Sequence, residues 1–471
     1  MSAQKLVVFE LNEVPFRVFD YFIDKHPDSN FARMFQRSDV FETHVEDEGH
    51  LSPWVTWPSV HRGVNNAKHG IQDFGQDLTE VDGEYPPIWE ILAKGGVSVG
   101  MFGPLHSYPV PKSLDHYKFY IPDTFAAGPE CFPEQLSAFQ EFNLAMVDAS
   151  GRNVSKALML DKAMPFLAAA PGLGLRAKTV LSLGRQLAAE RLNPYMICRR
   201  RTSQAEIAFD FFLRQLKRNT PDISWFFSNH VASTMHRYWP GTFPGDYPDV
   251  IWAEGYEQRF SGEIDYTMGV ADRFAGELMA FANNNPGTSI IVMGSMGQEA
   301  VPDRLQVNCQ IMCTDLTKFM TTMGVEKDQW ERRRAMAPSY SVVVSDAAKS
   351  NFLSRMSKLR IANANVDFHE HGGAIKFDLG QANLPDDISV GDGEHMYELA
   401  DLGLRNVEIT DKSSAFAYHI PQGVFTHYNP SKRNGFATQR RSISTLEIAP
   451  AFIRNFGLEP AGYMQGGLKL S

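Results

Sequence analysis

Three short apolar runs, each leading into small polar residues, constrain the fold of this chain most. They are Leu6–Phe9, Ile223–Phe227 and Ser289–Met293, and they lead into Asn12, Asn229 and Ser295. Helix-like stretches separate the runs, and strands that alternate with helices form mainly parallel sheets covered on both faces. The sequence therefore predicts an α/β fold in which the three runs are neighbouring central strands. Their carboxyl ends, where ligands of such sheets gather, should share one edge.

The length of 471 residues and the 43% hydrophobic content suffice for one large core with insertions. We assign residues 1–150 and 202–471 to that core and treat 299–412 as an insertion within it. Residues 151–201 carry ten Lys and Arg among apolar residues at helical spacing, which predicts an inserted, basic helical cap. The cap is either a surface that attracts a phosphorylated or lipid-linked substrate or a helical hairpin with a solvated charged face.

Composition excludes several classes of function. A net charge of −10 argues against a protein that coats nucleic acid, which requires a dominant basic face. The first apolar run stops at Glu10, too early for a signal peptide, and no segment has the roughly 18 uncharged apolar residues of a membrane span. The four cysteines are scattered and predict reduced thiols. We therefore expect a cytoplasmic protein without a transmembrane segment.

Residues 52–59, Ser-Pro-Trp-Val-Thr-Trp-Pro-Ser, are followed by Gly63 and by His69-Gly70-Ile71. This pattern resembles the nucleophile segment of the type I phosphodiesterase/nucleotide pyrophosphatase family, in the alkaline phosphatase superfamily. Blocks at 423–425, 429–430, 446–450 and 456–458 resemble the family's closing strand and final helix. The resemblance implies an alkaline-phosphatase-like fold with Thr56 at the nucleophile position, although Thr56 also fits an ordinary helix start.

Enzymes of this family resemble two-metal clamps with six ligand positions that supply Asp and His. Carried onto this chain, two of the six positions keep a histidine, namely His236 and His419. The other four hold residues that are neither Asp nor His: Asn12, Ala232, Ser295 and Met296. Hard divalent cations need anionic donors, and zinc prefers three or four strong ligands. The resemblance therefore predicts at most one divalent ion, zinc or manganese, on His236 and His419, with His230 as a candidate third donor.

The remaining candidates follow from the same matches. Thr56, His236, His419 and Asn12 are the catalytic candidates, with a histidine as acid and base for Thr56 if no metal binds. The substrate-binding candidates are Ser59, at the position of the family's asparagine, together with Arg62, Arg237 and Ser295. Asn12-Glu13 stands where the resembled family has Asp-Gly, and Glu13 is either a relocated metal ligand or a residue at the start of the following helix, where a carboxylate interacts favourably with the helix dipole. We assign it to the helix start.

Two functions from different classes remain. The first is a divergent phosphodiesterase- or phosphatase-like hydrolase, or a group transferase, that uses Thr56 in a metal-poor site. The second is a non-catalytic ligand-binding or scaffold member of the superfamily. In both cases the expected ligand is a phosphorylated or glycan-type small molecule, including lipid-linked ones.

Overall fold

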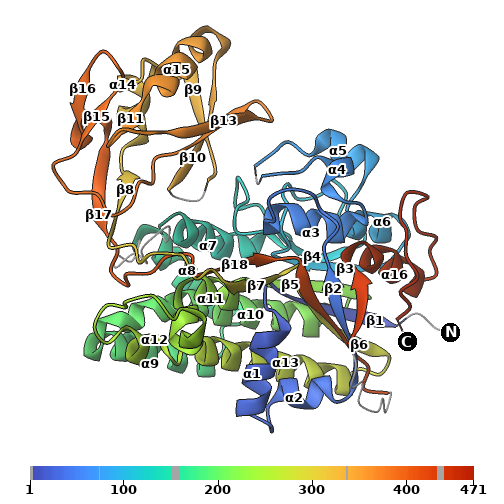
Figure 1. Cartoon of the computed structure of the whole chain (residues 1–471). Coiled ribbons are helices and arrows are strands. Elements are labelled where there is room, and N and C mark those ends of the chain that lie inside the picture. The colour runs from blue at the N-terminus through green and yellow to red at the C-terminus, as the bar shows by residue number, and fades with distance from the viewer. Residues whose placement is uncertain (1–3, 74, 150–159, 336–337, 432–439, 471) are drawn as a thin grey trace.

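The computed structural model describes residues 4–73, 75–149, 160–335, 338–431 and 440–470. An eight-stranded sheet lies at the centre of this described part (Figure 1). In spatial order its strands are β20 (Arg441–Ser444), β2 (Ser38–His44), β19 (Gln422–Tyr428), β6 (Thr288–Met293), β1 (Lys5–Leu11), β5 (Ile223–Ser228), β3 (Val99–Phe102) and β4 (Tyr117–Ile121). Neighbouring strands are parallel except where β19 pairs with β2 and β6. The predicted mainly parallel α/β sheet is confirmed.

Helices bury both faces of this sheet, and β1 shows why its sequence is almost continuously apolar. Val7 and Phe9 enter one hydrophobic core, whereas Leu6 and Val8 enter the other. The first core is covered by α1 (Phe16–Lys25), α2 (Asn30–Phe35), α7 (Ser137–Ala149), α8 (Leu160–Leu173), α10 (Arg200–Asn219), α11 (His230–Thr242), α12 (Tyr256–Phe260) and α13 (Glu263–Asn284). The second is covered by α3 (Pro53–Arg62), α6 (Ile88–Lys94) and α16 (Ile448–Asn455).

The three apolar runs found in the sequence are neighbouring strands, as predicted. β1 lies between β5 and β6, with Leu11 opposite Ser228 and Glu10 opposite Met293. The three strands therefore end at nearly the same level, and the polar residues that follow them meet at one edge of the sheet.

The segment 151–201 is helical where it is described, and 151–159 lie outside the described residues. It comprises α8, α9 (Ala177–Leu192) and the 3-10 helix η2 (Pro194–Arg199). Phe166, Ala170 and Leu173 of α8 belong to the first core, so α8 packs on the main body of the protein.

A second lobe, orange in Figure 1, is built from part of the segment 299–412 around a hydrophobic core of its own. Its elements are β8 (Cys309–Cys313), α14 (Leu316–Thr322), β9 (Trp330–Arg333), β10 (Ser339–Val344), α15 (Asp346–Lys358), β11 (Arg360–Ile361), β12 (Ala364–Asn365), β13 (Asp367–His371), β14 (Ala374–Asp378), β15 (Ser389–Gly391), β16 (Met396–Glu398) and β17 (Leu404–Glu408). The antiparallel pair β7 (Gly297–Ala300) and β18 (Ala417–Ile420) lies where the chain leaves and re-enters the main body.

Two further observations concern the chain as a whole. None of the helices in the described ranges combines the length and the apolar character that crossing a membrane requires. All four cysteines are free thiols.

Candidate metal centre and active site

Asn12 and Glu13 follow β1 directly and stand beside the residue that follows β5. Asn12 Nδ2 donates a hydrogen bond of 2.7 Å to Asn229 Oδ1. Asn12 is buried, whereas Asn229 is exposed. The carboxyl edge of the sheet therefore reaches solvent at Asn229, where a ligand has access to it.

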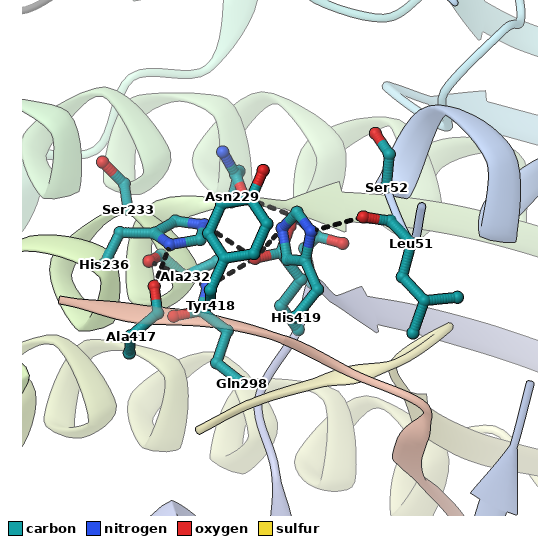
Figure 2. Close-up of polar contacts among 12 residues, drawn as sticks. Leu51, Ser52, Asn229, Ala232, Ser233, His236, Gln298, Ala417, Tyr418 and His419 are labelled. Atoms are coloured by element: carbon teal, nitrogen blue, oxygen red, sulfur yellow. Dashed lines mark hydrogen bonds and ion pairs between the residues drawn. The ribbon is translucent and has the colours of Figure 1, made fainter. Parts of the chain in front are cut away.

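Three side chains from distant parts of the sequence converge at this edge, and Figure 2 labels the two histidines among them, His236 and His419. Glu13 Oε2 lies 3.0 Å from His236 Nε2 and 3.4 Å from His419 Nε2. His236 comes from α11 and His419 from β18, and the donor atoms of all three residues lie within 4.8 Å of one another. The structure thus brings together the two histidines that the motif comparison singled out, and it adds a carboxylate between them.

The other ring nitrogen of each histidine determines its tautomer. His236 Nδ1 lies 2.6 Å from the carbonyl oxygen of Ala417, and His419 Nδ1 lies 2.7 Å from that of Leu51. A carbonyl oxygen only accepts hydrogen bonds, so each Nδ1 carries a proton. In each ring Nε2 is therefore the atom that faces Glu13 Oε2, to which it donates when it carries a proton and beside which it offers a lone pair to a cation when it does not. Histidine ligands of metals are oriented by this kind of backbone contact.

Glu13 is held in place by its backbone and by two amides. Its φ of 60° lies in the left-handed region, which is uncommon for residues other than glycine. Asn12 Nδ2 donates to Glu13 Oε1 at 2.7 Å, and Gln298 Nε2 donates to Oε2. Gln298 also donates to the carbonyl oxygen of Ala232 at 3.3 Å. The Glu13 carboxylate thus lies near Ala232, the position at which the resembled family has an aspartate ligand.

Two assignments made from the sequence are wrong. Glu13 does not serve the start of α1, because its carboxylate is bound by Gln298 and the two histidines. His230 is not the third donor, since its ring is buried and its nitrogens contact Ser228 Oγ at 2.8 Å and the Thr267 carbonyl at 3.2 Å. One signal for Glu13 was present: the family has glycine here, which indicates a left-handed backbone that another residue adopts only at a cost.

The charges of the cluster stabilise one another. Burial by itself raises the pKa of Glu13, but His419 and His236 beside it hold that pKa well below its usual range. Burial by itself lowers the pKa of His419, whereas the Glu13 carboxylate and the Leu51 carbonyl raise it above its usual value. Glu13 is therefore ionised at neutral pH and presents an anionic oxygen to both imidazoles.

Thr56 lies near the start of α3, with its side chain buried. Its hydroxyl lies 2.8 Å from Ser295 Oγ and donates to the Ser52 carbonyl at 3.2 Å. His419 binds the carbonyl of Leu51, the residue next to Ser52, so the start of α3 connects Thr56 with the cluster. Within the described residues, the Thr56 hydroxyl forms hydrogen bonds with Ser52 and Ser295 and with neither histidine.

The positions of a second metal ion hold neutral groups. Both polar atoms of the Asn12 side chain form hydrogen bonds. Its Oδ1 accepts from Trp57 Nε1 at 2.7 Å, and its Nδ2 donates to Glu13 and Asn229. Ser295 binds Thr56, and the side chain of Met296 is fully buried. Among the described residues, the close group of potential metal ligands consists of Glu13, His236 and His419, and none of Asn12, Ser295 and Met296 belongs to it.

Two substrate-binding candidates are buried and bind partners outside the cluster. Ser59 Oγ donates to Asp47 Oδ1 at 2.5 Å and lies 2.8 Å from His69 Nε2, in the short helix α4 (Asn66–His69). Arg62 is fully buried and forms an ion pair with Asp82 of α5 (Thr79–Glu84). These contacts stabilise α3 and the segment after it, and they leave neither side chain exposed to a substrate.

Arg237 has a different environment, next to His236 on α11. Its Nη1 donates to the carbonyl and to Oγ of Ser233, both at 3.1 Å, and the residue is only partly buried. Figure 2 shows Ser233 beside His236. Of the two arginines that the sequence suggested, Arg237 is therefore the one that lies close to the cluster.

Comparisons with known proteins reveal distant structural similarity. No family model and no curated protein sequence matches the chain. Among solved structures, murine ectonucleotide pyrophosphatase/phosphodiesterase 5 is 9% identical, with a TM-score of 0.42, covering 97% of this chain and 96% of that one. Phosphonoacetate hydrolase from Sinorhizobium meliloti, in complex with phosphonoformate, is 13% identical with the same TM-score, covering 97% and 95%.

Proposed function

We propose that this protein is a metal-dependent hydrolase or group transferase of phosphoric esters, with one zinc ion held by Glu13, His236 and His419. One observation carries the proposal: two imidazole Nε2 atoms and one carboxylate oxygen lie close together, and backbone carbonyls bind Nδ1 of both rings, which leaves Nε2 as the ligand atom. A bound cation would replace the protons that Nε2 otherwise donates to the carboxylate.

The donor set fits zinc better than manganese. Two imidazole nitrogens and one carboxylate are a ligand set of catalytic zinc sites, in which a fourth position stays open for water or substrate. Manganese prefers sets richer in oxygen. His236 is partly exposed, and Asn229 beside the cluster is exposed, so the open position has access to solvent. When bound there, zinc supplies a Lewis acid that neutralises charge developing on a phosphoryl oxygen.

The same contacts argue against a free histidine as acid or base. In each ring Nδ1 is bound to a carbonyl and Nε2 faces Glu13. Neither His236 nor His419 has a nitrogen left that could exchange a proton with a substrate. We therefore assign both to the metal, in place of the acid/base role considered from the sequence.

Thr56 is the proposed nucleophile. With its proton donated to the Ser52 carbonyl, Thr56 Oγ1 accepts from Ser295 Oγ and retains a lone pair for attack on phosphorus. Attack forms a bond between phosphorus and Oγ1 and breaks the bond from phosphorus to the leaving oxygen, which takes up the proton that Oγ1 gives up. Water then releases the phosphoryl group in a hydrolase, and an acceptor hydroxyl does so in a transferase.

A second candidate function is a non-catalytic binder of phosphorylated or glycan-type ligands. Two observations on Thr56 favour a binding protein: its side chain is buried, and its hydroxyl donates to the Ser52 carbonyl. A threonine without a catalytic role forms the same hydrogen bond to the carbonyl four residues earlier in a helix. We further propose that the protein works in a reducing compartment such as the cytoplasm, and the four free thiols support this proposal.

Elemental analysis combined with a turnover assay tests the proposal. We expect about one equivalent of zinc per chain, loss of turnover of a chromogenic phosphodiester on chelation, and recovery on adding zinc. Zinc uptake without turnover of any phosphoric ester would favour the binding protein. A protein that takes up no zinc, or that keeps its turnover after chelation, would refute the metal centre.

A further inference from the structure

The helix α9 carries most of its large apolar side chains on its outer side. Val180, Leu181 and Leu187 are each at least half exposed, and Leu192 at the end of the helix is 89% exposed. These are four of the seven large hydrophobic side chains that are exposed in the described chain, and the other three lie in separate segments. Apolar side chains gathered in one place on a surface mark an interaction site, whereas single ones do not.

The side of α9 that faces the protein is largely polar. Ser182 Oγ donates to Glu206 Oε2 of α10 at 3.0 Å, and Gln186 Nε2 donates to the Met196 carbonyl of η2 at 2.6 Å. Of the five large apolar side chains of α9, only Leu183 packs on the first core. A surface helix normally turns its apolar side inwards and its polar side to water. This arrangement is reversed in α9, so its outer side is built to be covered.

The outer side of α9 carries positive charge alone. Its exposed charged residues are Lys178, Arg185 and Arg191, and no Asp or Glu of this helix is exposed. Lys178 forms an ion pair with Glu277, whereas neither arginine is paired with another described residue. The whole chain has a net charge of −10. An anionic surface therefore repels most of the molecule and attracts this side of α9, which orients the protein as it approaches.

A membrane surface matches this combination better than another protein does. Leucines together with arginines, whose apolar stems lie along hydrocarbon while their heads stay in water, are typical of helices that lie in a bilayer interface. The exposed positions of α9 include no Trp, Tyr or Phe, the residues that anchor most protein interfaces. A two-fold contact between two copies of this chain would set like charges against each other.

We propose that α9 docks this protein on membranes that contain anionic phospholipids. Its four exposed apolar side chains enter the boundary between headgroups and acyl chains, and Arg185 and Arg191 bind lipid phosphates. The helix is anchored to α10, where the Arg176 backbone N–H donates to Asp210 Oδ2 at 2.8 Å, so docking does not have to order it. Figure 1 shows α9 at the periphery of the main body, where a flat surface can reach it.

Flotation of the full chain with vesicles tests the proposal. One set of vesicles is phosphatidylcholine alone, and the other holds equal parts of phosphatidylcholine and phosphatidylglycerol. We expect binding to the mixed vesicles that falls as salt rises, and little binding to phosphatidylcholine. Each basic side chain near an anionic surface contributes about fivefold, so Arg185→Gln with Arg191→Gln should weaken binding about tenfold or more. Leu181→Gln with Leu192→Gln should cost a similar factor, because both lose apolar surface that the bilayer covers.

The matched control is Ile251→Gln with Leu305→Gln, which removes two exposed apolar side chains outside α9 and should leave vesicle binding unchanged. Circular dichroism checks that each variant is folded, and substitutions of exposed side chains usually change stability little. Wild-type protein that does not float with the mixed vesicles refutes the proposal, and so does wild-type binding by either α9 variant. Self-association in the ultracentrifuge that the leucine variant abolishes, without vesicle binding, would identify a protein contact in place of the membrane. The test requires neither zinc nor turnover, so its outcome is independent of the proposed metal centre.

Discussion

Replacing Glu13 by glutamine tests the metal centre most directly. The substitution keeps the size and shape of the side chain and exchanges one anionic oxygen for an NH2 group. In the structure, donors of Asn12 and Gln298 and the Nε2 atoms of both histidines face that carboxylate. A glutamine can no longer act as an anionic ligand, and two neutral imidazoles alone hold zinc weakly.

The expected size of the effect follows from linkage. A ligand that binds only the folded protein adds about 4 kcal/mol at a free concentration about 1,000 times its Kd. Unfolding entropy is about 2.1 cal/mol/K per residue, so a chain of 471 residues has a total of about 1 kcal/mol/K. Saturating zinc should therefore raise the Tm of the wild type by about 4 °C. The same zinc concentration should leave the Tm of Glu13→Gln almost unchanged.

Differential scanning fluorimetry across a zinc titration measures this shift, and elemental analysis after desalting measures the bound ion. Glu299→Gln is the matched control, since Glu299 is exposed and follows Gln298 on β7. It should keep the wild-type shift. A Glu13→Gln protein that binds one equivalent of zinc and shows the full rise in Tm would refute Glu13 as a ligand.

Three further predictions concern other residues of the site. Thr56→Ala should abolish phosphodiester turnover while Thr56→Ser keeps part of it, and equal rates for wild type and Thr56→Ala would exclude the nucleophile. His236→Ala and His419→Ala should each lower turnover on the order of 10²-fold or more, with matching loss of zinc by elemental analysis. Burial raises the pKa of Asp47 from 3.8 to about 6, so the folded protein keeps a proton that the unfolded chain releases. Stability should fall by up to about 3 kcal/mol as pH rises through this window, and Asp47→Asn should flatten that dependence in urea titrations; an unchanged slope would contradict it.

The neighbourhood of the site could be predicted from local sequence, because strands and their ends depend on short patterns. Near-continuous apolar runs indicated β1, β5 and β6, and the polar residues after them indicated where these strands end. The resemblance to the phosphodiesterase family singled out His236 and His419 at its ligand positions, and the structure brings both to one carboxylate. These inferences needed no knowledge of which side chains touch.

Only the tertiary structure decided which groups complete the centre. The sequence by itself determined that Glu13 follows a strand, but a left-handed backbone and the amides of Asn12 and Gln298 direct its carboxylate to the two histidines. In the same way Arg62 and Arg237 look alike in sequence, yet Arg62 is fully buried and pairs with Asp82, whereas Arg237 is partly exposed and binds Ser233. Such contacts join residues far apart in the chain, and they depend on how helices and loops pack above the sheet. The local pattern of apolar and polar residues predicts strands and helices but not how these elements pack against one another.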